Sequence, residues 1–168
     1  MTVRDATPAD ARAIAEIRVA SWRETYAGMV PQVVLDGLDV GRNEAWMAQR
    51  LREPGTTSTL VVADAGPVLG YAMLAPARDA DAAGLGEVEA IYLAPSATRR
   101  GLGGELMAES LLRLAADGHP EAVVWVLTDN AGARRFYEHT GFTADGTARM
   151  LDFDGTPVEE IRYRRPIG

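Results

Sequence analysis

The sequence has 168 residues, enough for one ordinary domain with a substantial buried core. Hydrophobic residues make up 47% of it and charged residues 24%, which is the profile of a folded protein and excludes a disordered one. The net charge of −7 argues against nucleic acid as a partner, because neutralising phosphates needs a basic surface.

The residue types and segments that the sequence lacks exclude further kinds of site. There is no cysteine, which excludes disulfides, thiolate metal sites and a cysteine nucleophile, and we expect no metal ion. All 17 basic residues are arginine, so no lysine can act as a base or form a Schiff base. No run of about 18 apolar residues is present, and the first residues lack a basic leader followed by an apolar stretch. We therefore expect a cytoplasmic protein without a membrane partner.

Helical periodicity and turn residues predict mainly helices in the first third of the chain, followed by strands. In chain order we expect a strand at 3–5, a helix that begins with Thr7 and Pro8 and ends by Gly28, a short helix after Pro31, a helix from its cap Asp39 through Trp46 to Leu51, and strands at 59–63 and 68–74.

The second half predicts alternating strands and helices. In chain order we expect a loop at 79–86, a strand at 87–93, a helix at 102–116, a strand at 122–127 covered on both faces, a helix at 131–139, and strands at 149–153 and 158–163 that flank a hairpin turn at Asp154-Gly155. No internal repeat or linker is visible. The chain is thus expected to form a single α/β domain over residues 1–168.

A glycine-rich segment between the 87–93 strand and the 102–116 helix is the most informative feature. It reads Pro-Ser-Ala-Thr-Arg-Arg-Gly-Leu-Gly-Gly over residues 95–104. Glycines allow close approach of the backbone, and the unpaired N–H groups of a helix start attract anions, so a pyrophosphate would fit here. A turn that merely needs a positive φ is the alternative. The spacing matches neither a P-loop nor a Gly-x-Gly-x-x-Gly motif.

Three segments together resemble the GNAT N-acetyltransferase superfamily: 87–95, the loop to Gly104, and 130–142. The loop form Gln/Arg-x-x-Gly-x-Gly/Ala is matched by residues 98–103, except that Thr98 replaces the long polar residue. The form Asn-x-x-Ala-x-x-Phe/Leu-Tyr-x-x-x-Gly-Phe is matched throughout by residues 130–142. The resemblance, which covers residues 2 to 165, implies an α/β GNAT acyltransferase fold: a mixed, mostly antiparallel sheet of six to seven strands, with flanking helices and a splayed central strand pair.

The resemblance also implies acetyl-CoA as acyl donor. The pyrophosphate would lie on the loop amides, and the pantetheine arm would pair with the strand backbone at Ile91 and Leu93, where a backbone N–H could polarise the thioester carbonyl. Asn130 would bond the arm or a water, although an N-cap role is equally natural. The implied donor-binding residues are Ile91, Tyr92, Leu93, Arg99, Arg100, Gly101, Leu102, Gly103, Gly104, Asn130, Ala133 and Phe136.

Tyr137 occupies the family position of the general acid, whose alternative is a core tyrosine. For the base, Glu87, Glu89 and an ordered water chain remain open, and strand alternation would put Glu87, Glu89, Ile91 and Leu93 on one face. His119 and His139 are interpreted as surface residues.

The acceptor is expected to be an amine, with Trp22, Tyr26 and Glu89 as substrate-side residues. Packing of both aromatic rings against the sheet is the alternative. A small molecule is favoured over a protein or peptide N-terminus because the chain is acidic. A non-catalytic acyl-CoA sensor is the rival from another class. A homodimer could form through the C-terminal hairpin.

Overall fold

The computed structural model describes residues 1–63 and 65–168. Its strands are β1 (Thr2–Asp5), β2 (Ser58–Ala63), β3 (Val68–Pro76), β4 (Gly86–Leu93), β5 (Glu121–Leu127), β6 (Thr143–Phe153) and β7 (Thr156–Pro166). Its helices are α1 (Ala11–Thr25), α2 (Gln32–Asp36), α3 (Val40–Arg52), α4 (Leu102–Ala116) and α5 (Ala131–His139). Short 3₁₀ turns lie at Pro8–Asp10, Ala80–Ala82 and Pro95–Ala97. The order of elements is the one expected from the sequence.

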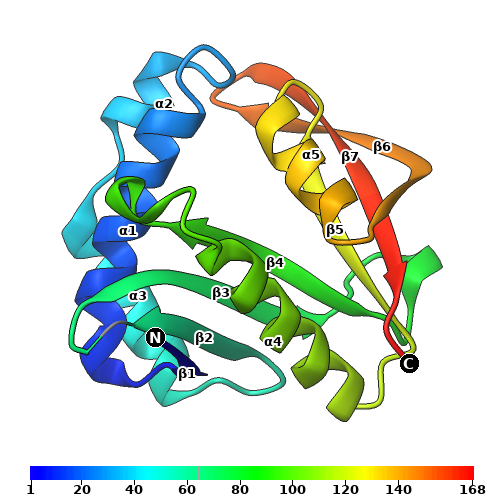
Figure 1. Cartoon of the computed structure of the whole chain (residues 1–168). Helices are drawn as coiled ribbons and strands as arrows, with labels where there is room; N and C mark the ends of the chain where they lie inside the picture. Colours follow the sequence, from blue (N-terminus) through cyan, green and yellow to red (C-terminus); the bar gives the residue numbers. More distant parts are fainter. Residues whose placement is uncertain (64) are drawn as a thin grey trace.

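In the described chain, seven strands form one sheet in the order β1-β2-β3-β4-β5-β7-β6 (Figure 1). Neighbouring strands are antiparallel except for β4 and β5, which are parallel. This confirms the expected mixed, mostly antiparallel sheet. Its seven strands are the larger of the two numbers expected. β6 and β7 are longer than expected and meet at Asp154 and Gly155, whose positive φ angles of 52° and 83° suit a tight hairpin turn.

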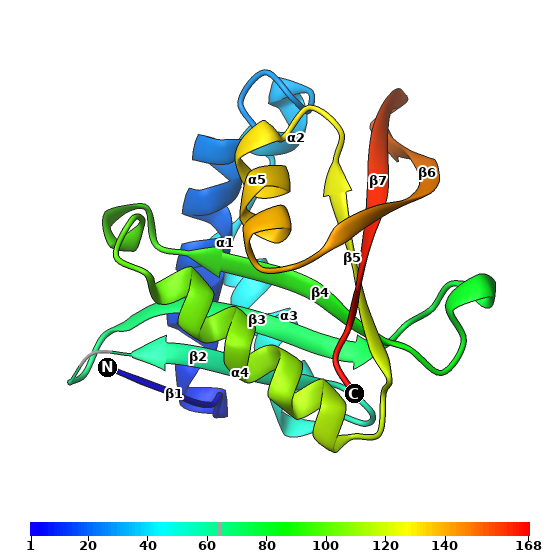
Figure 2. The ribbon, with the colours of Figure 1, turned by 45° about the vertical axis from the view of Figure 1, so that its right-hand side comes forward.

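Helices cover both faces of the sheet (Figure 2). On one face, Leu106 of α4 is buried in a core that includes Leu60 of β2. On the other face, Ile14 of α1 and Met47 of α3 are buried with Val61, the next residue of the same strand. Because successive strand side chains point to opposite faces, β2 serves both cores.

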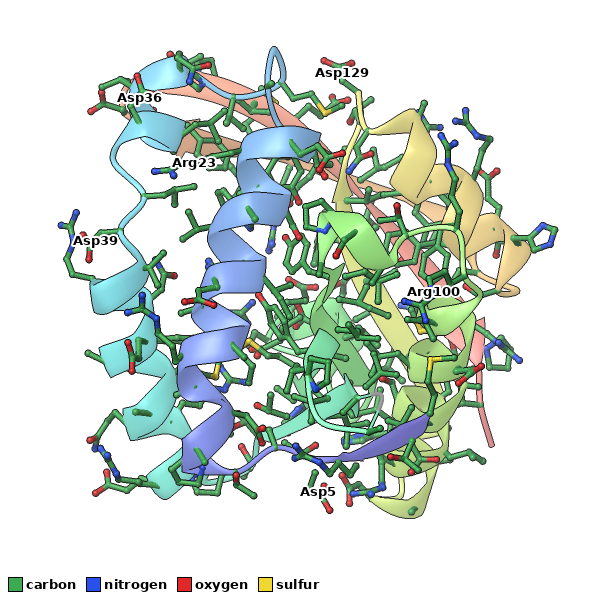
Figure 3. All side chains as sticks on the ribbon, turned by 60° about the vertical axis from the view of Figure 1, so that its left-hand side comes forward. Asp5, Arg23, Asp36, Asp39, Arg100 and Asp129 are labelled. Carbon is green, nitrogen blue, oxygen red and sulfur yellow. The ribbon has the colours of Figure 1, made fainter. Side chains whose placement is uncertain are left out.

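Side-chain caps mark the starts of α3 and α5. Asp39 caps α3, since its carboxylate accepts a hydrogen bond from the Arg42 N–H at 2.7 Å (Figure 3 shows Asp39 at the start of this helix). The first helix ends at Thr25, three residues before the Gly28 stop that we expected. Among residues 1–63 and 65–168, no helix has both the length and the apolar character needed to cross a bilayer.

The parallel strands β4 and β5 separate soon after they meet. They pair only at Gly86 with Ala122 and at Glu87 with Val123. Beyond these positions β4 stays paired with β3, and β5 with β7, so the two strands diverge as Figure 2 shows. The expected splayed central pair is therefore present. The edge of β4 after Glu87 faces a gap instead of a neighbouring strand.

Candidate active site

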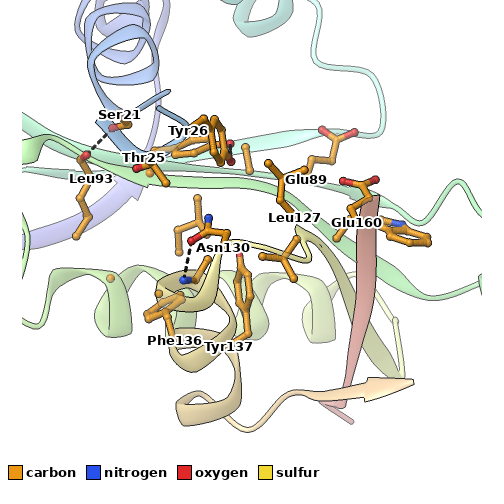
Figure 4. Close-up of a pocket in the computed structure, with 18 of the residues that line it drawn as sticks. Ser21, Thr25, Tyr26, Glu89, Leu93, Leu127, Asn130, Phe136, Tyr137 and Glu160 are labelled. Carbon is orange, nitrogen blue, oxygen red and sulfur yellow. Dashed lines mark hydrogen bonds between the residues drawn. The ribbon is translucent and has the colours of Figure 1, made fainter. Parts of the chain in front are cut away.

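A cavity of about 790 Å³ occupies the gap between β4 and β5. Its size falls in the range of small-molecule sites. Most of the residues that we assigned to a site from the sequence line it; Figure 4 shows Phe136 and Leu93 toward one end and Glu89 and Glu160 toward the other. The lining residues from the expected set are Trp22, Tyr26, Glu87, Glu89, Ile91, Tyr92, Leu93, Arg99, Gly101, Gly103, Gly104, Asn130, Ala133, Phe136 and Tyr137.

One end of the cavity is the amino terminus of α4. Gly101 caps this helix at φ +79°, and the first intrahelical bonds run from the N–H groups of Gly104 and Glu105 to its carbonyl. The preceding N–H groups, of Leu102 and Gly103, therefore have no partner within the helix. A Cβ added at Gly104 would have no atom within 4 Å, so open space lies there. This geometry suits an anion.

Two expected loop residues do not line the cavity. The side chain of Leu102 is fully buried in the core, so only its backbone can serve a ligand. Arg100 is exposed on the loop before α4 (Figure 3). Arg99 does line the cavity, with a left-handed φ of 62°. Thr98, the departure from the family pattern, donates its hydroxyl to the Pro95 carbonyl at 3.1 Å, within the loop itself.

The expectation that Glu87, Glu89, Ile91 and Leu93 share one strand face is wrong. The register between β3 and β4 shifts where Met73 pairs with Ala90 and Leu74 with Val88, so Glu89 is an extra residue in a β-bulge. The bulge reverses the alternation. Val88, Ile91 and Leu93 pack in the core beneath α4, while Ala90 and Tyr92 pack in the core beneath α1 and α3.

The β4 edge is also held from α1. The Ser21 hydroxyl donates to the Leu93 carbonyl at 2.7 Å (Figure 4). One lone pair of that carbonyl is thus already used within the protein. The contact links α1 to the strand end that leads into the glycine loop, and it joins residues 72 positions apart, so no local pattern indicated it.

Asn130 begins the motif that forms α5, and Tyr137 lies within the helix. The Asn130 side chain accepts a hydrogen bond from the Ala133 N–H at 3.1 Å, which confirms its N-cap role. Tyr137 is buried and reaches from α5 toward the gap (Figure 4). No hydrogen bond joins its hydroxyl to another described residue. Burial raises the pKa of Tyr137 above its ordinary value, so the phenol keeps its proton at neutral pH.

The two candidate bases differ in their surroundings. Glu89 accepts a hydrogen bond from Arg50 Nη2 at 2.5 Å. Glu87 is buried beside the more distant Arg78, whose Nη2 lies 3.5 Å from Glu87 Oε1. Burial raises the pKa of Glu87 above its ordinary value, and the positive charge of Arg78 offsets this only in part. A carboxylate with a raised pKa in a cavity is suited to accept a proton.

Aromatic rings form the wall on the α1 side. Trp22 and Tyr26 meet edge to face with ring centroids 4.9 Å apart, and both line the cavity. The hydroxyl groups of Tyr26 and Tyr92 are hydrogen-bonded at 2.9 Å. The pair therefore packs and lines a pocket at the same time. The packing interpretation is confirmed, and the substrate-side role of the two rings stays a prediction.

Comparison with known proteins identifies the family. The family model described as the acetyltransferase (GNAT) family matches residues 14–142. The chain belongs to the GNAT acetyltransferase family. It is therefore an acyltransferase, and its fold is that of GNAT enzymes.

Proteins similar to this chain are named as acetyltransferases. A probable N-acetyltransferase of Mycobacterium tuberculosis is 27% identical over 96% of this chain and 91% of its own length. An uncharacterized N-acetyltransferase of Bacillus subtilis is 33% identical over 77% and 73%. A solved phosphinothricin acetyltransferase of the GNAT superfamily from Sinorhizobium meliloti, in complex with acetyl-CoA, is 28% identical, with a TM-score of 0.76 over 99% of this chain and 88% of that one.

The GNAT cavity also contains polar residues that the sequence did not single out. They are Thr25, Arg78, Trp125, Thr140, Arg149 and Glu160. Glu160 is 6% exposed and pairs with Arg149 Nε on the adjacent strand. The guanidinium of Arg149 stacks on Trp125, 4.0 Å from the ring centroid. The signal available beforehand was charge at alternate strand positions, since Glu160 and Arg162 alternate with Ile161 and Tyr163 in β7.

Proposed function

We propose that this GNAT enzyme transfers the acetyl group of acetyl-CoA to a primary amine of a small molecule, with Tyr137 as acid and Glu87 as base. One observation carries the proposal. A single cavity joins the open amino terminus of α4 to the buried Tyr137 phenol and the Glu87 carboxylate. An anion site, a proton donor and a proton acceptor therefore face the same space.

The residues present fit the donor. The N–H groups at the start of α4 and the Arg99 side chain would hold the pyrophosphate, and the space beside Gly104 leaves room for it. The edge of β4 after Glu87 would pair with the amide-bearing arm, because its outward backbone groups lack a strand partner. When bound, acetyl-CoA supplies an acetyl thioester.

Two side chains move the protons. Glu87 accepts one from the ammonium of the acceptor, which leaves a nucleophilic neutral amine. A carbon–nitrogen bond forms while the carbon–sulfur bond breaks. Tyr137 Oη gives its proton to the departing sulfur and takes one from the new amide nitrogen. The products are an amide and coenzyme A, and the proton on Glu87 passes to solvent.

A small acceptor is supported by the aromatic enclosure around Trp22 and Tyr26 and by the acidic chain. The relative that is 28% identical is named as a phosphinothricin acetyltransferase, a name compatible with a small acceptor here. We further propose that residues 1–168 form one GNAT domain. Location in the cytoplasm and a homodimer through the β6–β7 hairpin stay predictions.

The test is release of thiol from acetyl-CoA by the purified chain with a panel of amines. Tyr137→Phe should lower kcat by about 10²-fold, the usual worth of a general acid, while the melting temperature stays near that of the wild type. The matched control is Tyr163→Phe, which removes a hydroxyl that donates to Glu138 at 2.9 Å and accepts from Arg134 at 3.1 Å. It should lower stability and spare kcat. Coenzyme A binding without turnover of any amine would instead favour an acyl-CoA sensor.

A further inference from the structure

The charged residues at the end of the cavity away from the glycine loop are unequally paired. Arg50 holds Glu89 at 2.5 Å. Arg149 pairs with Glu160 through its Nε, approaches Asp79 at 3.5 Å and stacks on Trp125. In these groups each charge has a close partner of opposite sign, so they already satisfy one another.

Arg78 and Glu87 form the exception. Their closest atoms are 3.5 Å apart, at the outer limit of a hydrogen bond, and Arg78 Nε is 4.0 Å from Glu89. The Arg78 side chain is 69% exposed, whereas that of Glu87 is 4% exposed. The exposed arginine side chain can therefore change its rotamer, whereas the buried carboxylate is held in the wall of the cavity. A cation and an anion thus stand side by side in the cavity without a tight bond between them.

A ligand that carries both charges on neighbouring atoms complements this pair. In an α-amino acid the carboxylate is one carbon away from the ammonium group. The guanidinium of Arg78 can bind a carboxylate through two parallel hydrogen bonds. Glu87 would then face the ammonium group, from which it must take a proton in the proposed reaction. An amine without a carboxylate could face Glu87 but would make no ion pair with Arg78.

Another part of the cavity wall is apolar. Trp22, Tyr26 and Phe153 pack around Leu127, and all four line the cavity together with Leu151. The rings of Trp22 and Phe153 lie with their centroids 6.5 Å apart. Such a surface favours an apolar or aromatic side chain over a charged one.

We propose that the acceptor is a free α-amino acid with an apolar side chain, whose carboxylate binds Arg78 and whose amino group faces Glu87. The proposal rests on the acetyltransferase function above and specifies its substrate class. The product is an N-acetyl amino acid: the carbon–sulfur bond breaks, the carbon–nitrogen bond forms, and the protons move through Glu87 and Tyr137 as described. Arg78 is a specificity-determining residue that touches the substrate and takes no part in proton transfer.

Three matched acceptors test the proposal: L-phenylalanine, L-phenylalaninamide and 2-phenylethylamine, which share the ring and the amine and differ in the carboxylate. We expect kcat/KM for L-phenylalanine to exceed kcat/KM for each of the other two acceptors by about tenfold or more. A factor of this size corresponds to the free energy of one charge-assisted hydrogen-bonded contact. In Arg78→Gln this ratio should fall to about one. The control is Arg42→Gln, which removes an exposed arginine of α3 that lies 3.8 Å from Asp39 and outside the cavity, and which should keep the wild-type ratio.

A binding measurement separates failure of this proposal from failure of the reaction itself. Trp22 and Trp125 line the cavity, so L-phenylalanine should change tryptophan fluorescence saturably, and Arg78→Gln should weaken that change about tenfold or more. Equal rates for all three acceptors, with an unchanged ratio in Arg78→Gln, would overturn the amino-acid proposal and leave the acetyltransferase function standing. If no amine is acetylated but the fluorescence change depends on Arg78, the reaction fails and the amino-acid site stands. No acetylation and no such change overturn both.

Discussion

Arg50 Nη2 of α3 donates to Glu89 Oε2 of β4 at 2.5 Å, with only 15% and 14% of the two side chains exposed. Glu89 lies in the bulge of β4, next to Ala90, which packs in the core beneath α1 and α3. The consequence of the ion pair concerns the neighbouring Glu87, which pairs with no arginine closer than 3.5 Å. Of the two glutamates that could act as base, Glu89 is bound as a structural ion pair and Glu87 is available.

The first prediction follows for the pH dependence of the rate. The proposed base Glu87 would accept a proton only in its ionised form, so kcat/KM should rise with pH through its pKa, which burial raises above the ordinary value of about 4.3. Glu87→Gln should remove this acidic limb and lower kcat/KM by about 10²-fold. Glu89→Gln is the matched control. It should weaken folding, because Arg50 loses its partner, yet keep the limb. If the limb survives in Glu87→Gln, a water chain or another group is the base.

The second prediction concerns stability. Glu87→Gln should raise the stability at pH 7, although it should lower the rate. A raised pKa means that the folded state binds this proton more tightly than the unfolded chain does. The contribution is fully favourable below the unfolded pKa and is lost as pH rises through the folded pKa. At pH 7 the buried carboxylate therefore costs stability, and Glu87→Gln should raise the melting temperature. Near pH 3 the difference from the wild type should vanish. Thermal unfolding at both values checks this, and a lowered melting temperature at pH 7 contradicts it.

The parts of the site that could be predicted from sequence are those made by local chemistry. The glycine loop and the cap formed by Asn130 depend on neighbouring residues, so their signals lie within a few positions of one another. Tyr137 was found because it belongs to the same motif as that cap. Each of these lies in the cavity as expected.

The acceptor end could not be predicted in the same way, because it depends on contacts between distant segments. Arg50 and Glu89 are 39 positions apart, and Arg162 reaches Asp81 across 81 positions. The bulge that reverses the faces of β4 depends on pairing with β3, which a strict alternation pattern does not contain. Charged residues at inward strand positions indicate that such pairs exist. They do not indicate which residues pair with each other.

A third prediction concerns the space at the start of α4. Alanine at Gly104 would meet no protein atom within 4 Å, and in a helix it is favoured over glycine by about 1 kcal/mol. Gly104→Ala should therefore unfold at a higher urea concentration. Its methyl group would occupy the space assigned to the pyrophosphate, so coenzyme A should bind about tenfold more weakly by calorimetry. Gly41→Ala in α3, outside the cavity, should leave that affinity unchanged. Unaltered affinity in Gly104→Ala would place the phosphates elsewhere.

The fourth prediction concerns Arg162, which is 2% exposed and ties the segment after Arg78 to the β6–β7 hairpin. Its guanidinium donates to Asp81 at 2.7 and 2.8 Å and to Asp145 at 2.6 Å. Burial alone would raise the pKa of Asp145, but the hydrogen bonds from Arg162 and the Thr147 N–H outweigh it and lower that pKa.

Arg162→Met should cost about 3–5 kcal/mol in urea unfolding at pH 7, because carboxylates lose their buried partner. A lowered folded pKa contributes stability above the unfolded pKa that is lost as pH falls through the folded value, so the deficit should shrink below about pH 4 as the aspartates protonate. Arg12→Met, which breaks the exposed pairs with Glu16 and Glu44, should leave the unfolding free energy almost unchanged. A deficit for Arg162→Met as small as that of Arg12→Met, or one that persists undiminished in acid, would show that the aspartates do not depend on this arginine.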